Sequence, residues 1–360
     1  MRSKMKDGVH RWKVREGDEK DLKGVLSLRR TVFGEMEKDK LDPRFWQWEF
    51  MEGPVGKALI YIVEDGDKII GHFADLPRQF SVHRKVVRGT LSVDLMVSPA
   101  YRRKGIFEEL GRYAIRRVKD EGNSFTTAYP IRKETIHGFK KIGWQEIVRL
   151  PVLVYPIRFC GIINRYLHFL PFSLLIGGLA RILYNPLFVR RRRKEDGRIE
   201  IEKIGELDNQ FEYFLGRAIS LYPNMGIRDR EYMAWRYFRH PTRNYTIYRA
   251  IEKGEMRGFI ILRKVDLLAF HSAVIVDLLA LDEDALTALV EKGITYSQRE
   301  GVDLLGFMVP EVHPYYHLLR KQGFLRSPKT FLFMLYSHEE DKELLDPKGW
   351  YVNWGDTDVI

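Results

Sequence analysis

The chain has 360 residues, of which 45% are hydrophobic and 13% aromatic, and it contains a single cysteine, Cys160. The length predicts two domains, and the apolar content excludes a disordered, collagen-like or low-complexity protein. One cysteine excludes an internal disulfide and a cysteine-based zinc site, so we predict no metal and a cytoplasmic location. No apolar run follows the charged N-terminus, which argues against a secretory signal.

The net charge of +11 is unevenly distributed along the chain. Residues 1–150 carry +9, whereas residues 201–360 carry −4. A basic domain suggests an anionic partner, which can be nucleic acid, a membrane surface or a phosphate-bearing cofactor.

One pattern of residues occurs twice along the chain. Trp48 and Trp235 are 187 residues apart, as are Gly71 and Gly258. Two later landmarks recur in the same order at slightly shorter spacings: Val93-Asp94-Leu95 as Val276-Asp277-Leu278, and Lys141-Ile142-Gly143-Trp144 as Lys321-Gln322-Gly323-Phe324. Self-similarity of this kind predicts two copies of one module.

Each copy has the residue pattern of a mixed α/β module. A helical segment precedes a strand hairpin, and a strand, a helix, a further strand and a closing helix follow it. This order predicts an α/β fold with a mixed central sheet flanked by helices. We expect a first module at 10–155, an apolar and basic linker at 156–199, a second module at 200–338, and an aromatic, acidic tail at 339–360 that docks on a module.

The segment from Leu95 to Leu110 has the features of a diphosphate-binding loop. A strand runs into Pro99, three cations (Arg102, Arg103 and Lys104) and Gly105 follow, and an amphipathic helix starts at once. The N–H groups at a helix start have no internal acceptor and carry the positive end of the helix dipole. Such a junction attracts anions, and the glycine allows close approach of the backbone.

The residues Val97-x-Pro99-x-x-Arg102-x-x-Gly105-Ile106, with the later Lys141-Ile142-Gly143-Trp144, resemble the acyl-CoA-binding core of the GNAT superfamily of N-acyltransferases. Phe107 departs from the small residue that the family has at the end of this motif, and we expect it to reshape the pocket. The resemblance covers most of residues 10 to 155 and extends more weakly to 200 through 336.

The resemblance implies acetyl-CoA, or a longer acyl-CoA, as the cofactor. Its pantetheine arm would pair with the backbone of Leu95, Met96 and Val97. Its diphosphate would lie on the cations and amides of Arg102, Arg103, Lys104, Gly105, Ile106 and Phe107. Catalysis would be direct attack of a neutral amine on the thioester, which needs a base for the amine and an acid for the departing thiolate.

Asp94, just before the cofactor segment, is the candidate base, although Asp277 recurs in the second copy and a structural hydrogen-bonding role is the alternative. Period-two alternation places Met96 on the face of Asp94 and Leu95 on the other face. The family often uses a tyrosine four residues before the closing glycine as the acid, and Phe139 occupies that position. Tyr129 is the candidate that replaces it, with His137 or water as alternatives.

The second copy has lost this loop. Leu281-Asp282-Glu283-Asp284-Ala285-Leu286 puts three carboxylates where the first copy has three cations, and such a loop should repel a diphosphate. The sequence therefore resembles a tandem acyltransferase with a degenerate C-terminal module.

The linker holds an uncharged stretch, Tyr166 to Ala180, followed by the basic run Arg190 to Lys194. The stretch is too short to span a bilayer, so it is either a packed helical linker or a patch that rests on the inner face of a membrane through 156–194. Nucleic acid is a third possible partner of the basic run, but no recognition motif accompanies it. The leading hypothesis is an N-acetyltransferase that acts on a small or sugar-linked amine, with no nucleic acid as partner. The alternative is a catalytically weak acyl-CoA-binding sensor or scaffold.

Overall fold

The computed structural model describes residues 12–34, 38–167, 182, 198–339 and 341–358. The strands are β1 Lys13–Glu16, β2 Leu59–Asp65, β3 Lys68–Val82, β4 Lys85–Val97, β5 Phe125–Ala128, β6 Gln145–Pro156, β7 Ile199–Ile204, β8 Asn224–Gly226, β9 Thr246–Glu252, β10 Glu255–Leu267, β11 Phe270–Ala280, β12 Leu304–Met308, β13 Leu325–Ser337 and β14 Trp350–Tyr351. The helices are α1 Leu22–Phe33, α2 Pro43–Met51, α3 Ile106–Asp120, α4 Lys133–Lys141, α5 Phe159–Leu167, α7 Asn209–Ala218, α8 Arg230–Met233, α9 Glu283–Arg299 and α10 Pro314–Lys321.

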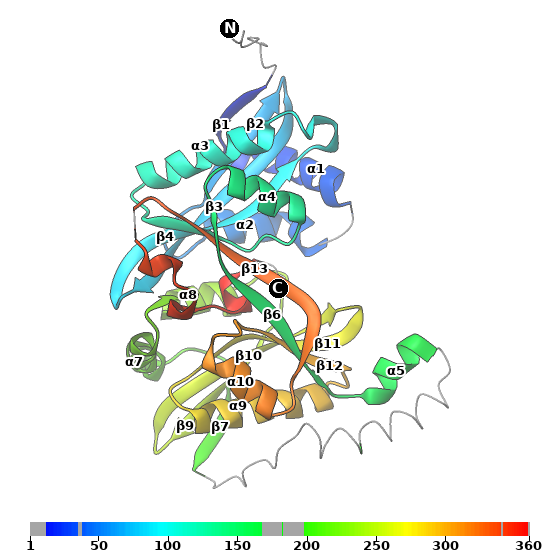
Figure 1. Cartoon of the computed structure of the whole chain (residues 1–360), viewed down its shortest axis with the longest axis vertical. Coiled ribbons are helices and arrows are strands. Elements are labelled where there is room, and N and C mark those ends of the chain that lie inside the picture. Colours follow the sequence, from blue (N-terminus) through cyan, green and yellow to red (C-terminus); the bar gives the residue numbers. More distant parts are fainter. Residues whose placement is uncertain (1–11, 35–37, 168–181, 183–197, 340, 359–360) are drawn as a thin grey trace.

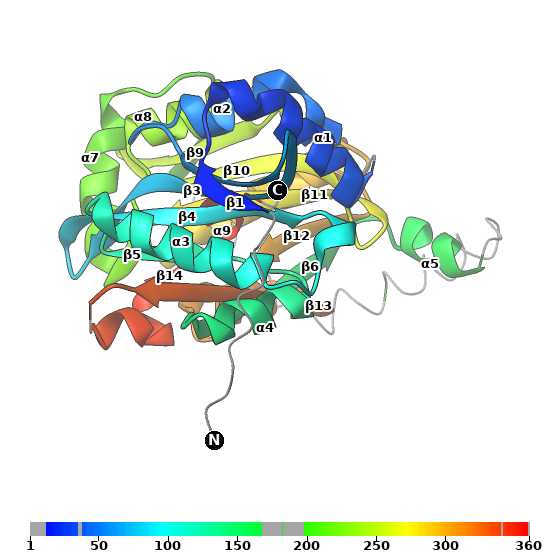
Figure 2. The same cartoon turned by 90° about the horizontal axis from the view of Figure 1, so that it is seen from above.

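The fold is mixed α/β, as the sequence predicts. All strands join one 14-stranded sheet in the order β1-β2-β3-β4-β5-β13-β6-β12-β11-β10-β9-β7, with β8 and β14 paired beside it. Helices α1 and α2 cover one face of the N-terminal half of this sheet, and α3 and α4 cover the other (Figure 2). The second half repeats the element order of the first, with β9–β10, β11, α9, β12, α10 and β13 in the places of β2–β3, β4, α3, β5, α4 and β6.

The last strand of each half pairs with a strand of the other half. β13 pairs with β5, where Met334 lies opposite Ala128, and β6 pairs with β12, where Val154 lies opposite Gly306. β6 and β13 also pair with each other and cross the middle of the molecule (Figure 1). Because of this exchange the two halves of the described chain share one continuous sheet, and the module limits expected from the sequence stay a prediction.

The centre of β6 explains why this strand is suited to the middle of the sheet. Leu150, Val152 and Leu153 are fully buried, so both faces of the strand are apolar. A strand with two apolar faces is stable only when both faces are covered. One apolar cluster accordingly extends from Val25 of α1 to Ile294 of α9.

Two tryptophans mark the contact between the halves near the pseudo-symmetric centre. The rings of Trp48 and Trp235 stack with centroids 4.5 Å apart. Trp48 Nε1 donates to the carbonyl of Trp235 at 2.9 Å, and Trp235 Nε1 donates back to the carbonyl of Trp48 at 3.0 Å. The repeated residues therefore meet each other directly.

The aromatic tail packs into the molecule. Trp350, Tyr351 and Trp354 are buried, and β14 pairs with β8. Asp356, at the end of the tail, is held by Arg228 at 2.7 Å.

In the linker, the structure describes α5, whereas residues 168–181 and 183–197 lie outside the described residues. This includes most of the apolar stretch and the whole basic run, so both interpretations of the linker stay predictions. No helix within the described part of the chain is long and apolar enough to cross a membrane.

Candidate active site

The start of α3 presents unpaired backbone donors. Gly105 precedes the helix at φ 91°, a left-handed conformation that favours glycine, and no side chain caps this end. The amide of Glu109 is the first that bonds back into the helix, to the carbonyl of Gly105 at 3.1 Å. The side chains of Arg102, Arg103 and Lys104 are exposed, and none of them forms an ion pair with a carboxylate in the described part of the chain. Open space surrounds Gly105, so this junction forms a cationic cradle lined by N–H groups.

The surroundings of the loop fix its shape. The Tyr101 hydroxyl donates to Asp65 at 2.7 Å, which ties the loop to the β2–β3 turn. Ile106 is buried and anchors the first turn of α3 in the apolar layer. Phe107 packs between α3 and α4, where its ring lies against Gly138, so it fills the helix interface and leaves the cradle open.

The edge of β4 next to this cradle is open. β4 pairs with β5 only at Thr90 and Leu91, and beyond these residues the two parallel strands separate. The amide of Ser98 donates to Ile70 of β3 at 2.8 Å. Because successive backbone groups of a strand point to opposite sides, the N–H and C=O of Val97 point toward the gap, where the carbonyl accepts a hydrogen bond from Nε of Arg102 at 3.4 Å. The side chains of Leu95 and Val97 pack toward α3, and Met96 packs on the other face.

In the second half, side chains of the protein occupy the two positions that correspond to the free start of α3 and the free edge of β4. Asp282 caps α9, accepting a hydrogen bond from the amide of Ala285 at 2.8 Å, and it also pairs with Arg257. The Tyr315 hydroxyl accepts from the amide of Ala280 at 2.9 Å and donates to the carbonyl of the same residue at 3.2 Å. Ala280 ends β11 as Val97 ends β4. The second half therefore offers neither a free helix end nor a free strand edge.

Asp94 lies in a β-bulge at φ 54°, where the register of β3 and β4 shifts. Its carboxylate forms ion pairs with Arg29 of α1 and with Lys40, whose Nζ is 3.4 Å away. Burial acts to raise the pKa of Asp94, but these two cations outweigh it and hold the pKa well below its usual range. A carboxylate with two cationic partners is a poor proton acceptor, so this environment favours the structural role of Asp94 over that of a catalytic base.

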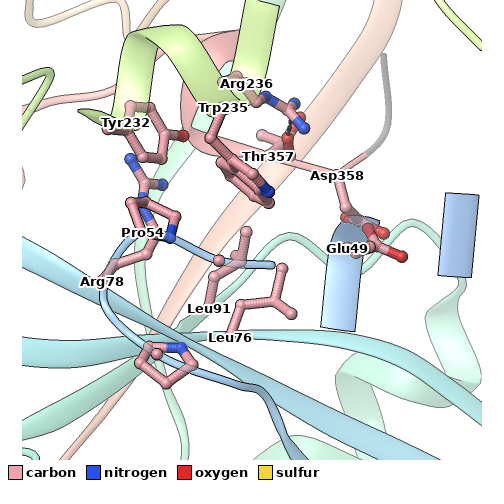
Figure 3. A pocket seen from close by; sticks show the side chains of 13 residues that line it. Glu49, Pro54, Leu76, Arg78, Leu91, Tyr232, Trp235, Arg236, Thr357 and Asp358 are labelled. Carbon is pink, nitrogen blue, oxygen red and sulfur yellow. Dashed lines mark hydrogen bonds between the residues drawn. The ribbon is translucent and has the colours of Figure 1, made fainter. Parts of the chain in front are cut away.

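A pocket opens on the face of the sheet that carries α1 and α2, beside the point where β4 and β5 separate. It is bounded by α2 and its following loop, by β3 and β4, by the α8 region of the second half, and by the tail (Figure 3). Its lining residues are Glu49, Gly53, Pro54, Gly56, Leu76, Pro77, Arg78, Leu91, Tyr232, Trp235, Arg236, Thr357 and Asp358. We call it the acceptor pocket. The cradle at α3 lies on the opposite face of the sheet.

Glu49 has the properties expected of a base in this pocket. Its side chain is 3% exposed, and its Oε2 atom has no hydrogen-bond partner within the described part of the chain. Burial raises the pKa of Glu49 to about 8, with Lys40 opposing this and Asp94 and Asp358 adding to it. Lys40 is itself held by Asp358, with Nζ 2.9 Å from the carboxylate. A carboxyl group that titrates near neutral pH is suited to general acid–base work.

The other expected catalytic residues lie at different places. Tyr129, just beyond β5, stacks on Phe333 with centroids 5.3 Å apart, and burial together with the charge of Asp356 raises its pKa well above the ordinary value. Its hydroxyl is therefore protonated at neutral pH and able to donate. Phe139 has no ionisable group, and it is buried and stacks on Trp144 with ring centroids 4.6 Å apart.

Two histidines of the N-terminal half, His72 and His137, have structural or exposed positions. His72 is fully buried and its Nδ1 donates to the carbonyl of Asp94 at 2.9 Å, so it supports the bulge. Burial lowers the pKa of His72, which favours the neutral ring. His137 is exposed on α4.

Comparisons with known proteins agree with this geometry. Residues 13–147 match a family model described as an acetyltransferase (GNAT) domain. This part of the chain is therefore similar to GNAT acetyltransferase domains. A GCN5-related N-acetyltransferase from Anabaena variabilis ATCC 29413 has a similar structure, with 13% identity, a TM-score of 0.65, and coverage of 92% of this chain and 74% of that chain. A GCN5-related N-acetyltransferase from Kribbella flavida has 15% identity and a TM-score of 0.61, with coverage of 91% and 71%. A search of curated protein sequences finds no match.

Glu49 is a functional candidate that the sequence motifs do not indicate. Glu49 stands among Phe45, Trp46, Trp48 and Phe50 on α2, and all four of these aromatic residues are buried. A carboxylate on the buried side of an aromatic helix is a recognisable signal, because carboxylates are rarely buried without a specific role.

Proposed function

We propose that this protein transfers an acyl group, acetyl above other acyl groups, from acyl-CoA to the primary amine of a small molecule, and that the N-terminal module carries the catalysis. The observation that carries this proposal is the contrast between the two halves. α3 begins without a cap beside an open strand edge, whereas Asp282 and Tyr315 fill the same positions in the second half.

The residues of the cradle fit the donor. The diphosphate would lie on the amides of residues 103–107, with Arg102, Arg103 and Lys104 adding positive charge. The pantetheine arm would pair with the β4 edge formed by residues 95–97. When bound, acyl-CoA supplies the thioester carbonyl that the amine attacks. The open space around Gly105 supports this assignment, since a side chain there would enter the cradle.

In this proposal two side chains transfer protons, one from the amine and one to the departing thiolate. Glu49 in its ionised form accepts a proton from the amine, and its pKa near 8 matches that task. Tyr129 donates a proton to the departing thiolate through its protonated hydroxyl. Asp94 holds Arg29 and Lys40 in place, and Lys40 in turn holds Asp358 against the pocket.

The second half has a structural part in this scheme. Tyr232, Trp235 and Arg236 complete the acceptor pocket, and Thr357 and Asp358 of the tail close it. In this scheme the degenerate second half forms part of the pocket of the active half. The shared sheet holds the two halves in the relative position that this pocket needs.

Acyl transfer tests the proposal directly. The full chain is mixed with acetyl-CoA and a panel of primary amines, thiol release is followed, and the acylated products are identified by mass spectrometry. We expect transfer by the wild type and its loss in Glu49→Gln with acetyl-CoA binding retained. Absence of acetyl-CoA binding would contradict the proposal. Binding without turnover on any amine would favour the acyl-CoA sensor, the alternative that the buried Phe139 supports.

A further inference from the structure

Three side chains that can bind a metal ion meet beside the turn between β3 and β4. His83 is the first residue of this turn, whereas Asp341 and Glu343 belong to the start of the tail, far away in the chain. One ligand atom from each of them lies within 4.8 Å of the ligand atoms of the other two. Metal–ligand bonds of about 2.1 Å place the ligands of a tetrahedral ion roughly 3.4 Å apart, so small side-chain rotations bring all three groups onto one ion.

The backbone segments that carry these side chains are held in place by hydrogen bonds. His83 has φ 50°, and its amide donates to the carbonyl of Pro223 at 2.8 Å. Nδ2 of Asn224 donates to the carbonyl of Glu343 at 3.4 Å. Oδ1 of Asp341 accepts from the amide of Glu343 at 2.9 Å, so this carboxylate keeps a second oxygen for an ion. The fold thus brings the three groups together before an ion binds.

The cluster is open to solvent. The side chain of His83 is 36% exposed and that of Glu343 is 71% exposed, and Nε2 of the imidazole is 2.7 Å from Oε2 of the carboxylate. A surface hollow of about 380 Å³ adjoins the imidazole, and its lining residues are His83, Arg84, Ser220, Leu221, Tyr222 and Pro223. An ion therefore reaches the ligands directly from water, and water molecules complete its coordination.

The chemistry of the donor set selects the class of ion. Calcium and magnesium take oxygen ligands, whereas imidazole nitrogen suits zinc and other first-row transition metals. Zinc is bound by histidine together with carboxylates and water in many proteins. One imidazole and two carboxylates therefore favour zinc over magnesium or calcium. The single cysteine of the chain excludes only a cysteine-based zinc site and does not bear on this donor set.

We propose that His83, Asp341 and Glu343 bind one zinc ion, which joins the start of the tail to the β3–β4 turn. From this point the tail continues to β14, which pairs with β8, and its last described residues line the acceptor pocket. The orange-to-red end of the chain lies beside the tip of the cyan β3–β4 hairpin in Figure 1. The ion acts as a clamp on the tail, and the proposal does not depend on acyl transfer.

Calorimetric titration of the metal-free full chain with zinc chloride tests the proposal. We expect zinc affinity to fall at least about tenfold in His83→Asn and in Glu343→Gln, since loss of a group that merely orients a ligand already has this effect. Asparagine tolerates a positive φ, so the turn is retained. His271→Asn is the matched control, because this exposed histidine also follows a hairpin turn and pairs with the single carboxylate of Asp266 at 3.8 Å.

Two results of this titration would overturn the proposal, namely no zinc binding and equal binding by the wild type and His83→Asn. Magnesium binding of the same strength would overturn the assignment to zinc. X-ray absorption at the zinc edge should show nitrogen and oxygen ligands alone. A sulfur ligand would instead place the ion at the free thiol of Cys160 and contradict the proposed site.

Trypsin cleavage after Lys342 measures the clamp itself. Lys342 is exposed and stands between the two carboxylate ligands. Zinc should slow this cleavage in the wild type and in His271→Asn, and it should have no effect in His83→Asn. A cleavage rate in the wild type that is the same with and without zinc would contradict the clamping of the tail.

Discussion

Glu49→Gln should change the pH dependence of stability in a way that the buried carboxyl alone explains. The pKa of Glu49 is raised from 4.5 to about 8 in the folded chain. A raised carboxyl pKa contributes stability that is fully present below pH 4.5 and is lost progressively as the pH rises toward 8. The loss amounts to about 1.4 kcal/mol for each pH unit within this window, or about 3 kcal/mol between pH 5 and pH 7. Glutamine has no such titration.

The assay is urea unfolding of the wild type and of Glu49→Gln at several pH values from 5 to 8. The difference in free energy of unfolding between the two proteins cancels the contributions of titrating groups that do not interact with Glu49; Asp94, Asp358 and Lys40 do interact with it. We expect this difference to move in favour of Glu49→Gln by about 3 kcal/mol from pH 5 to pH 7. Glu52→Gln removes an exposed carboxyl at the end of the same helix and calibrates the effect of losing a charge. A difference that stays constant with pH would refute the raised pKa of Glu49 and with it its assignment as the base.

Three further substitutions separate the roles of the two halves. Tyr129→Phe should lower kcat for acyl transfer about 100-fold without changing the Kd of acetyl-CoA, and an unchanged kcat would exclude the tyrosine as the acid. Asp282→Ala removes the cap of α9 and should lower the free energy of unfolding by about 1 kcal/mol in urea titrations, with acetyl-CoA affinity unchanged. Arg102→Gln should weaken acetyl-CoA binding about tenfold at low salt and less at high salt, since exposed charges are screened; a salt-independent Kd for both proteins would contradict an electrostatic contact.

Helix ends and the order of strand, loop and helix could be predicted from the sequence, because they depend on residues that are close together in the chain. Gly143 and Gly323 end their helices at φ 100° and φ 103°, as the Lys-x-Gly-aromatic corners indicate. The strand, loop and helix around Gly105 follow the expected order, because each step has its own signal in the residues: a β-branched run, a proline, a glycine and an amphipathic stretch.

The exchange of β6 and β13 could not be predicted in the same way. The pattern of Leu150, Val152 and Leu153 indicates a buried strand but carries no information about which strand lies beside it. Partner choice depends on contacts between residues far apart in the sequence, such as Gly306 with Val154.

The same holds for the site, where some features follow from neighbouring residues and others depend on residues far apart in the sequence. The cations of the loop are visible in the sequence, whereas the ion pairs that make Asp94 a poor base come from Arg29 and Lys40, which reach it only in the folded chain. The Tyr315 hydroxyl fills the second strand edge for the same reason, since it is 35 residues from Ala280. Local patterns locate the cradle, and tertiary contacts decide which groups remain free to act.

Calorimetric titration of the full chain with acetyl-CoA tests the central claim most directly. The account predicts one site per chain, no measurable binding in Gly105→Glu, and binding equal to wild type in Gly254→Glu. Gly254 is a matched control, because it also has a positive φ and open space around it but lies in the β9–β10 turn of the second half. Two sites per chain, or unchanged binding in Gly105→Glu, would contradict the claim that the uncapped start of α3 is the single acyl-CoA cradle of this protein.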